Sequence, residues 1–160
     1  MKALTIKEIL ESCGGEFFGE EKLLTTKVHS IVTDSRKATK DSMFVAIKGE
    51  RSDGHKFVAG TYENGAVCAL VKDIVDCPIP QIKVASTLNA VKDIARYYRS
   101  LFTIPFIGVT GSVGKTSTKE MLSAVLKEKF KVHKTQGNFN NELGLPLTVF
   151  RLRDEDSGIR

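Results

Sequence analysis

The segment of residues 111–116, which reads Gly-Ser-Val-Gly-Lys-Thr, limits the possible folds of this chain more than any other. An apolar run typical of a buried strand, residues 104–109, precedes it, and residues 117–122 after it are typical of a helix start. In this order, the backbone N–H groups of a glycine-rich loop and the positive end of a helix dipole converge on one anion. The sequence therefore predicts a phosphate-binding P-loop between a strand and a helix.

Two polar side chains of this loop have the chemistry that the pattern predicts. Lys115 would reach the β- and γ-phosphates of a nucleotide, and the Thr116 hydroxyl would bind Mg²⁺. The usual loop has another glycine five residues before Gly114, where this chain has Val109. The alternative interpretation is an ordinary turn between strand and helix, in which glycine serves only the backbone geometry.

Length and composition limit the class of protein. The 160 residues suffice for one domain or two small ones, and the apolar fraction of 41% suffices for a core. No apolar run approaches the length of a membrane span, and the N-terminus lacks the apolar segment and cleavage site of a signal peptide. Cys13, Cys68 and Cys77 are widely spaced and indicate neither a disulfide framework nor a zinc site. We expect a cytoplasmic protein without membrane insertion.

The net charge of +5 does not point to a nucleic-acid partner. Lysine and arginine are spread along the chain among aspartate and glutamate, with no basic block and no nucleic-acid-binding motif. An anionic small molecule such as a nucleotide explains a mild excess of positive charge equally well, and most of these residues are typical of a solvated surface. We therefore expect no nucleic acid among the partners.

The first part of the chain, residues 1–85, has the pattern of a small mixed α/β module. Apolar spacing predicts a helix over residues 5–13, with Thr5 and Glu8 as a capping box, and a second helix over residues 56–64. Short runs rich in β-branched and apolar residues predict four strands, at residues 28–33, 43–47, 66–71 and 82–84.

The second part, residues 86–160, has the pattern of a parallel-sheet nucleotide-binding domain. A helix capped by Thr87 is expected before the strand that leads into the P-loop, and a further strand is expected at residues 131–134 after the P-loop helix. The polar stretch that follows lies past the end of a strand, where open α/β sheets bind ligands, so Glu142 is well placed to help hold Mg²⁺. The alternative is a polar loop whose asparagines serve turn geometry.

The P-loop together with residues 137–146, Gly-Asn-Phe-Asn-Asn-Glu-Leu-Gly-Leu-Pro, resembles the Mur ligases, the ATP-dependent amide-bond-forming enzymes of peptidoglycan precursor synthesis. That family uses the shorter loop, so Val109 fits the resemblance. Residues 33–36 (Thr-Asp-Ser-Arg), 44–49 (Phe-Val-Ala-Ile-Lys-Gly) and 53–57 (Asp-Gly-His-Lys-Phe) look like the UDP-binding domain of two members. These members add the third residue, or the terminal dipeptide, to the muramoyl peptide.

The resemblance implies an α/β fold with a UDP-muramoyl-peptide-binding domain over residues 1–85 and the first, truncated part of a central P-loop ATPase domain over residues 86–160. It implies ATP and Mg²⁺ as cofactors, Lys115 and Glu142 as catalytic residues, and Thr116 and Glu142 as metal ligands. The ATP-binding residues that it implies are Gly111, Ser112, Val113, Gly114, Lys115, Thr116 and Ser117. The substrate-binding residues that it implies are Ser35, Arg36, Lys48, Gly49, His55, Asn138 and Asn141.

The sequence leaves other roles open for several of these residues. Ser35 also fits a turn at a strand end, Arg36 fits a surface charge, and His55 fits a hydrogen bond within its own loop. Phe44 and Phe57 are expected in the core rather than as stacking surfaces for a base.

Residues 140–148 favour the family member that adds the dipeptide, because the Thr-Thr-Pro run of the third-residue enzymes is absent. In that reaction the γ-phosphoryl group of ATP passes to the carboxylate of UDP-N-acetylmuramoyl-tripeptide, and the amine of D-alanyl-D-alanine attacks the resulting acyl phosphate. Family members continue through the rest of the central domain and a third domain, so we expect an N-terminal fragment without turnover of its own.

Three alternatives stay open at this point. The first is a Mur-type ligase that adds the third peptide residue. The second is a different P-loop enzyme, such as a kinase or a folate-polyglutamate-type ligase, although such ligases lack the N-terminal module. The third is a non-catalytic module that binds a UDP-sugar peptide.

Overall fold

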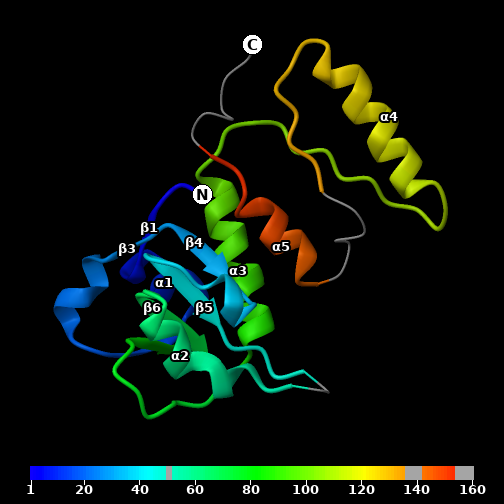
Figure 1. Ribbon diagram of the computed structural model, residues 1–160. Helices are drawn as coiled ribbons and strands as arrows, with labels where there is room; N and C mark the ends of the chain where they lie inside the picture. Colours follow the sequence, from blue (N-terminus) through cyan, green and yellow to red (C-terminus); the bar gives the residue numbers. More distant parts are fainter. Residues whose placement is uncertain (50–51, 136–141, 154–160) are drawn as a thin grey trace.

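A five-stranded sheet with the strand order β2-β7-β6-β5-β4 lies at the centre of the structure, a computed structural model that describes residues 1–49, 52–135 and 142–153 (Figure 1). Strands β4 to β7 pair in parallel, and β2 pairs antiparallel with β7 at one edge. The strands are β1 (Leu4–Thr5), β2 (Glu16–Phe18), β3 (Lys27–Val28), β4 (Ser30–Val32), β5 (Ser42–Val45), β6 (Cys68–Val71) and β7 (Gln81–Lys83). The mixed α/β fold class with a parallel-rich sheet is confirmed.

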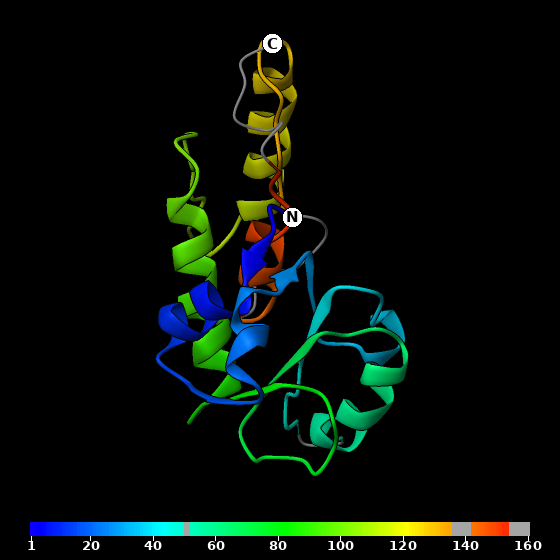
Figure 2. The same cartoon turned by 90° about the vertical axis from the view of Figure 1, so that its left-hand side faces the viewer.

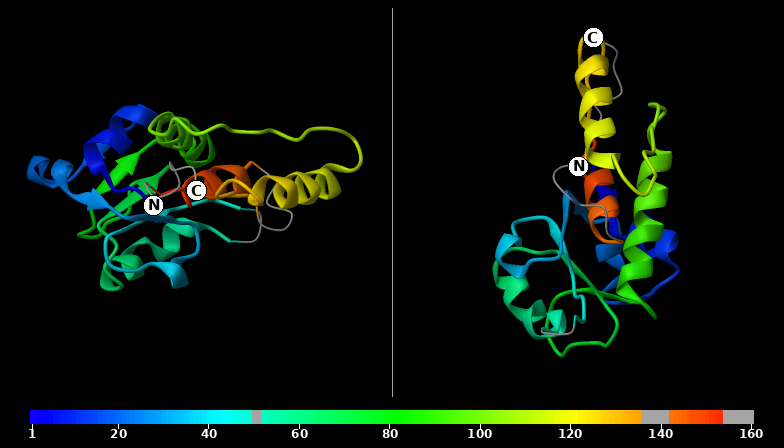
Figure 3. Two further views of the ribbon diagram at one scale, coloured as in Figure 1. Left: turned by 90° about the horizontal axis from the view of Figure 1, so that it is seen from above. Right: turned by 90° about the vertical axis from the view of Figure 1, so that its right-hand side faces the viewer.

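Helices cover both faces of this sheet. The α-helices are α1 (Ile6–Cys13), α2 (Val58–Glu63), α3 (Thr87–Ser100), α4 (Lys115–Lys127) and α5 (Gly144–Val149). The 3₁₀ turns are η1 (Glu21–Thr25), η2 (Ser35–Lys37) and η3 (Gly54–Phe57). Helices α1 and α3 lie on one face and α2 on the other (Figure 3). None of the helices that the structure describes has the length and apolar character of a membrane span.

Each central strand contributes to two hydrophobic cores because successive side chains point to opposite faces. Met43 and Val45 of β5 belong to the cluster beneath α1 and α3, whereas Phe44 between them belongs to the cluster beneath α2. The parallel register places Val45 beside Leu70 and Phe44 beside Ala69, so the neighbouring strand repeats the alternation. A strand that is apolar on both faces explains why these runs are recognisable in the sequence.

The predicted helix signals are confirmed with one change. Thr5 and Glu8 form the capping box of α1, and Gly14 ends that helix in the left-handed conformation with φ of 60°. The predicted N-cap of α3 is wrong by one residue: Ser86 is the cap, because its hydroxyl accepts the Asn89 N–H at 3.4 Å, and Thr87 is the first residue of the helix.

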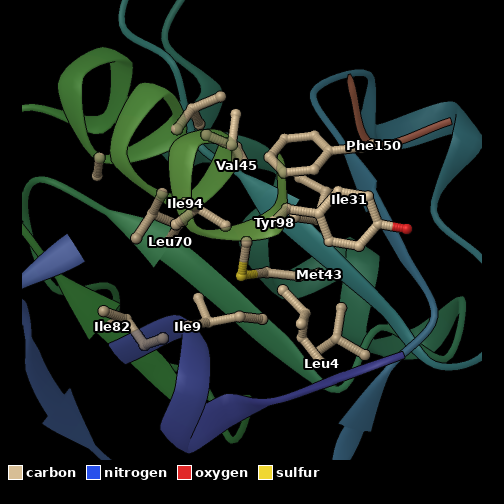
Figure 4. Packing of buried hydrophobic residues seen from close by; sticks show 14 of the residues in the cluster. Leu4, Ile9, Ile31, Met43, Val45, Leu70, Ile82, Ile94, Tyr98 and Phe150 are labelled. Carbon is tan, nitrogen blue, oxygen red and sulfur yellow. The ribbon is translucent and has the colours of Figure 1, made fainter. Parts of the chain in front are cut away.

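Tyr98 joins three parts of the chain at the centre of the larger core (Figure 4). Its fully buried ring packs edge-on against Phe150, which follows α5, with ring centroids 5.7 Å apart. Its hydroxyl accepts a hydrogen bond from the Lys2 backbone N–H at 2.6 Å and donates one to the Leu152 carbonyl at 2.6 Å. The N-terminal strand, α3 and the segment after α5 therefore share one core.

The two strands predicted on either side of the P-loop helix are wrong. Residues 104–109 are largely exposed and run as an irregular segment, in which Phe106 lies under the Arg99 guanidinium at 4.4 Å, and residues 131–134 are also irregular. A parallel strand is stable only when neighbouring strands pair with its N–H and C=O groups, and no other described segment pairs with residues 104–109. Helix α4 consequently lies apart from the sheet, beyond α5 (Figure 2).

We predict that Tyr98→Phe lowers the free energy of unfolding by about 1–3 kcal/mol, because the buried Leu152 carbonyl and the Lys2 N–H lose their shared partner. Urea unfolding measures the change. Tyr97→Phe is the matched control on the same helix, since its hydroxyl bonds the carboxylate of Glu8 at 3.0 Å nearer the surface, and we expect a loss below about 1 kcal/mol. Equal losses in the two variants would contradict the joining role of Tyr98.

Candidate functional site

An open pocket of about 410 Å³ lies where β4 and β5 end. Open α/β sheets bind ligands outside the carboxyl ends of their parallel strands. Two segments that are separate in the sequence, one after β4 and one after β5, meet here. The lining residues are Thr33, Asp34, Ser35, Arg36, Phe44, Ile47, Ser52, Gly54 and Phe57.

Arg36 extends its guanidinium at the mouth of this pocket, in a geometry that Asp34 holds. The Asp34 carboxylate accepts hydrogen bonds from Arg36 Nε at 2.9 Å and Nη2 at 2.8 Å, and it also accepts the Arg36 backbone N–H at 3.1 Å. These bonds lower the pKa of Asp34 from 3.8 to about 2. A guanidinium has five N–H donors, so three remain for another acceptor.

The other predicted substrate-binding residues of this module lie around the pocket without lining it. Lys48 forms an isolated antiparallel bridge with Asp53, and the Gly49 N–H donates to the Ser52 carbonyl at 2.9 Å. His55 is largely buried, and both of its ring nitrogens have protein partners. The alternative that the sequence left open for His55, a hydrogen bond within its own loop, is present as the bond to Asp53, and Nε2 has further partners after β6.

The two phenylalanines of the module have different environments. Phe44 is 1% exposed, as predicted for a core residue. Phe57 is 46% exposed and lines the pocket, so the prediction that it lies in the core is wrong. The structural reason is its position at the end of η3, where the chain turns from the pocket rim into α2.

The predicted P-loop leads directly into α4, which begins at Lys115. Gly114 is the N-cap residue with φ of 79°, and Gly111 has φ of 148°, both in a region that favours glycine. Every residue from Gly111 to Gly114 is exposed, and Val113 is 88% exposed. Backbone N–H groups at the N-terminus of this 13-residue helix are suited to an anion. Among the described residues, no side chain caps this terminus and the first turn has no acidic residue.

Lys115 folds back over its own loop. Its ammonium group donates to the Gly111 carbonyl and, at 3.4 Å, to the Ser112 carbonyl. Thr116 and Ser117 follow in the first turn of α4, and both are exposed. The structure therefore places the predicted ATP-binding residues in one continuous loop and helix start.

Glu142 is not part of a metal site formed by the described residues. Its side chain is 72% exposed, and its carboxylate pairs with the Lys92 ammonium of α3 at 3.0 Å. Among the residues that the structure describes, no group of three or more His, Cys, Asp or Glu side chains could hold a metal ion. The hydroxyl of Thr116 and the carboxylate of Glu142 are nevertheless the oxygen donors that Mg²⁺ prefers. Asn138 and Asn141 lie outside the described residues.

Sequence reasoning missed two charged partners of the predicted residues. Asp34 precedes Arg36 by two residues, a spacing at which an aspartate side chain commonly bonds the backbone N–H, so the local pattern could have revealed this pair. Lys92 is fifty positions from Glu142, and no signal in a single sequence connects them.

Several proteins of known activity are similar to this chain. The UDP-N-acetylmuramoyl-tripeptide–D-alanyl-D-alanine ligase of Bacillus subtilis is 42% identical over 151 residues, which are 92% of this chain and 33% of that protein. The ligase of the same name from Escherichia coli is 36% identical over 155 residues, which are 97% of this chain and 33% of that protein. The chain thus spans about a third of the length of the curated relatives that it matches.

Solved structures of MurF ligases are also similar to this chain. A MurF from Acinetobacter baumannii superposes with a TM-score of 0.89 at 36% identity, over 98% of this chain and 35% of that chain. A MurF ligase from Thermotoga maritima in complex with ADP superposes with a TM-score of 0.71 at 38% identity, over 76% of this chain and 28% of that chain.

Two family models match the chain in succession. The model of the Mur ligase family catalytic domain matches residues 27–99, which include the pocket, and the model of the Mur ligase middle domain matches residues 109–159, which include the P-loop. The pocket therefore lies in the segment that matches the first model, and the P-loop lies in the segment that matches the second. This chain belongs to the Mur ligase family.

Proposed function

We propose that this chain provides the UDP-binding module and the P-loop of an ATP-dependent ligase that joins D-alanyl-D-alanine to UDP-N-acetylmuramoyl-tripeptide. The proposal rests on two separate elements suited to an anion, the pocket lined by Arg36 and the loop at the N-terminus of α4, in a chain similar to ligases named for this reaction. The division into domains at residues 1–85 and 86–160 is part of the proposal, and so is a cytoplasmic location.

The pocket is the proposed site of the UDP group. Three donors of the Arg36 guanidinium stay available while Asp34 holds the other two, so a diphosphate can bind without breaking that pair. Ser35 lines the same pocket and could offer its hydroxyl, and the exposed side chain of Phe57 offers apolar surface for the uridine. A charged donor, a hydroxyl and an aromatic ring are the mixture of groups that nucleotide sites use.

The P-loop is the proposed site of the ATP phosphates. The backbone N–H groups of residues 111–114 and the N-terminus of α4 would hold the phosphates, and Lys115 would exchange its bonds to the loop carbonyls for phosphate oxygens. Thr116 and Glu142 would hold Mg²⁺, which neutralises phosphate charge during phosphoryl transfer. Asn138 and Asn141 are proposed to lie near the phosphates or the peptide.

The reaction that these groups would support is carboxylate activation. The γ-phosphoryl group of ATP passes to the tripeptide carboxylate, the amine of D-alanyl-D-alanine attacks the acyl phosphate, and phosphate leaves. The protein contributes position and positive charge, chiefly through Lys115, rather than a covalent bond.

A second candidate function is binding of the UDP-sugar peptide without turnover by this chain alone. The observation that favours it is that the described residues form the pocket by themselves, with an Arg36 guanidinium that keeps three donors available beside Asp34. Ligand binding is therefore the property to test first.

We predict that Arg36→Ala weakens binding of UDP-N-acetylmuramoyl-tripeptide about 10- to 100-fold, the effect of losing charged hydrogen bonds, and leaves Mg-ATP binding unchanged. Lys115→Ala should weaken binding of Mg-ATP and leave binding of UDP-N-acetylmuramoyl-tripeptide unchanged. Isothermal titration of the chain with each ligand measures both. Lys37→Ala and Lys127→Ala, which remove exposed charges from η2 and from the end of α4, are the matched controls. Equal affinities for the tripeptide ligand in wild type and Arg36→Ala would contradict the proposed UDP site.

We predict that Arg36→Ala also returns the pKa of Asp34 from about 2 toward its ordinary value of 3.8, because the largest cause of the lowered pKa is the Arg36 side chain. A group whose pKa is lowered in the folded state stabilises that state above its unfolded pKa. The Asp34–Arg36 pair should thus be intact above pH 4 and lost as the pH falls through about 2. A carboxyl ¹³C NMR titration of the wild type, Arg36→Ala and Lys37→Ala measures this. The same pKa in all three would show that Arg36 does not hold Asp34.

A further inference from the structure

His55 connects two neighbouring strand ends through both sides of its imidazole ring. Nδ1 lies 2.6 Å from Asp53 Oδ1, and Nε2 lies 3.0 Å from the backbone nitrogen of Lys72 and 3.3 Å from that of Asp73. The two backbone groups directly follow β6, whereas Asp53 belongs to the loop after β5. The side chain of His55 is 11% exposed, so this link is largely shielded from water.

The partners determine which nitrogen has the proton. Backbone N–H groups can only donate, so Nε2 must present its lone pair to Lys72 and Asp73. The proton of a neutral ring is then on Nδ1, where the Asp53 carboxylate accepts it. Bonds from the backbone N–H of His55, and then from its ring, lower the pKa of Asp53, which therefore stays an ionised acceptor.

The segment that His55 anchors is a wall of the ligand pocket. Gly54, immediately before it, donates its N–H to the Ile47 carbonyl at 2.9 Å and lines the pocket, as does Phe57. A Cβ on Gly54 would lie 2.8 Å from the Ile47 nitrogen and 3.0 Å from the Ala46 Cα, so the wall is in direct contact with the backbone after β5. Gly54 thus bonds the wall to the segment after β5, and His55 bonds it to the segment after β6.

We propose that His55 is a positioning residue of the ligand pocket: its neutral imidazole, protonated on Nδ1, links the pocket wall to the end of β6 and so sets the position of Gly54 and Phe57 against the bound nucleoside diphosphate. The positioning role rests on the proposed UDP binding, whereas the link to β6 does not. His55 does not line the pocket, and its ring makes no hydrogen bond to the ligand in this proposal because both ring nitrogens already have protein partners.

Two substitutions separate the two sides of the ring. In His55→Gln the amide oxygen reaches about as far as Nε2 and can accept from the N–H groups after β6. In His55→Asn the shorter side chain can bond only Asp53. We expect His55→Asn to bind UDP about tenfold more weakly than wild type and His55→Gln to stay within about threefold, as measured by isothermal titration with UDP itself. Lys56→Ala, at the exposed next residue, is the control and should bind as wild type does.

The tautomer of His55 is measured in the wild-type protein, so this part of the test does not depend on the folding of a variant. Long-range ¹H–¹⁵N NMR spectra should show a neutral His55 with its proton on Nδ1, and hydrogen exchange at Lys72 and Asp73 should be slow in wild type and His55→Gln but fast in His55→Asn. A proton on Nε2 at neutral pH would overturn the link. Wild-type UDP affinity in His55→Asn would overturn the positioning role, and so would an equal loss in both variants. If wild type does not bind UDP at all, the proposed function fails and the positioning role with it, while the tautomer still decides the link.

Discussion

The parallel pairing of β4, β5 and β6 is the constraint on which the candidate site depends. Parallel strands must end at the same edge of the sheet, so the loops after them meet although they are far apart in the sequence. Arg36 after β4, Gly54 after β5 and Lys72 after β6 reach one edge for this reason. The antiparallel strand β2 sits at the other side of the sheet, where it does not interrupt this arrangement.

Both sheet faces must be covered for this pairing to persist, and the chain covers them unequally. The smaller cluster beneath α2 lies behind the pocket, with Phe44 as a member that also lines it. The larger cluster takes in α1, α3 and the residues around α5, and Tyr98 ties these together. Since α5 follows the P-loop helix in the chain, the segment that contains the P-loop begins and ends at one core: it leaves from α3 and returns at α5. This core therefore limits how far the P-loop can move from the pocket.

The parts of the fold that depend on local signals were predictable from the sequence, and those that depend on partners were not. The capping box of α1, the helix after Gly114 and the doubly apolar strands each have their cause within a few residues. Residues 104–109 have the composition of a strand, but a strand also needs a neighbour to pair with, and composition does not report one. At the site, Ser35 and Arg36 were predicted together with their loop. The exposure of Phe57, the pairing of Glu142 with Lys92 and the two-sided use of His55 depend on tertiary contacts that no local pattern encodes.

The charged groups proposed to bind ligand are already paired within the chain, which makes binding an exchange of partners. Lys115 bonds carbonyls of its own loop, and Glu142 bonds Lys92. Glu142 is largely exposed, and an exposed ion pair is worth about 0–1 kcal/mol, so a Mg²⁺ ion or a phosphate group can replace these partners at little cost. Arg36 differs because its pairing with Asp34 leaves donors available, and the pair can remain when an anion binds. In the proposed function the pocket is therefore arranged before its ligand binds, whereas the P-loop and Glu142 would change partners when a nucleotide and a metal ion bind.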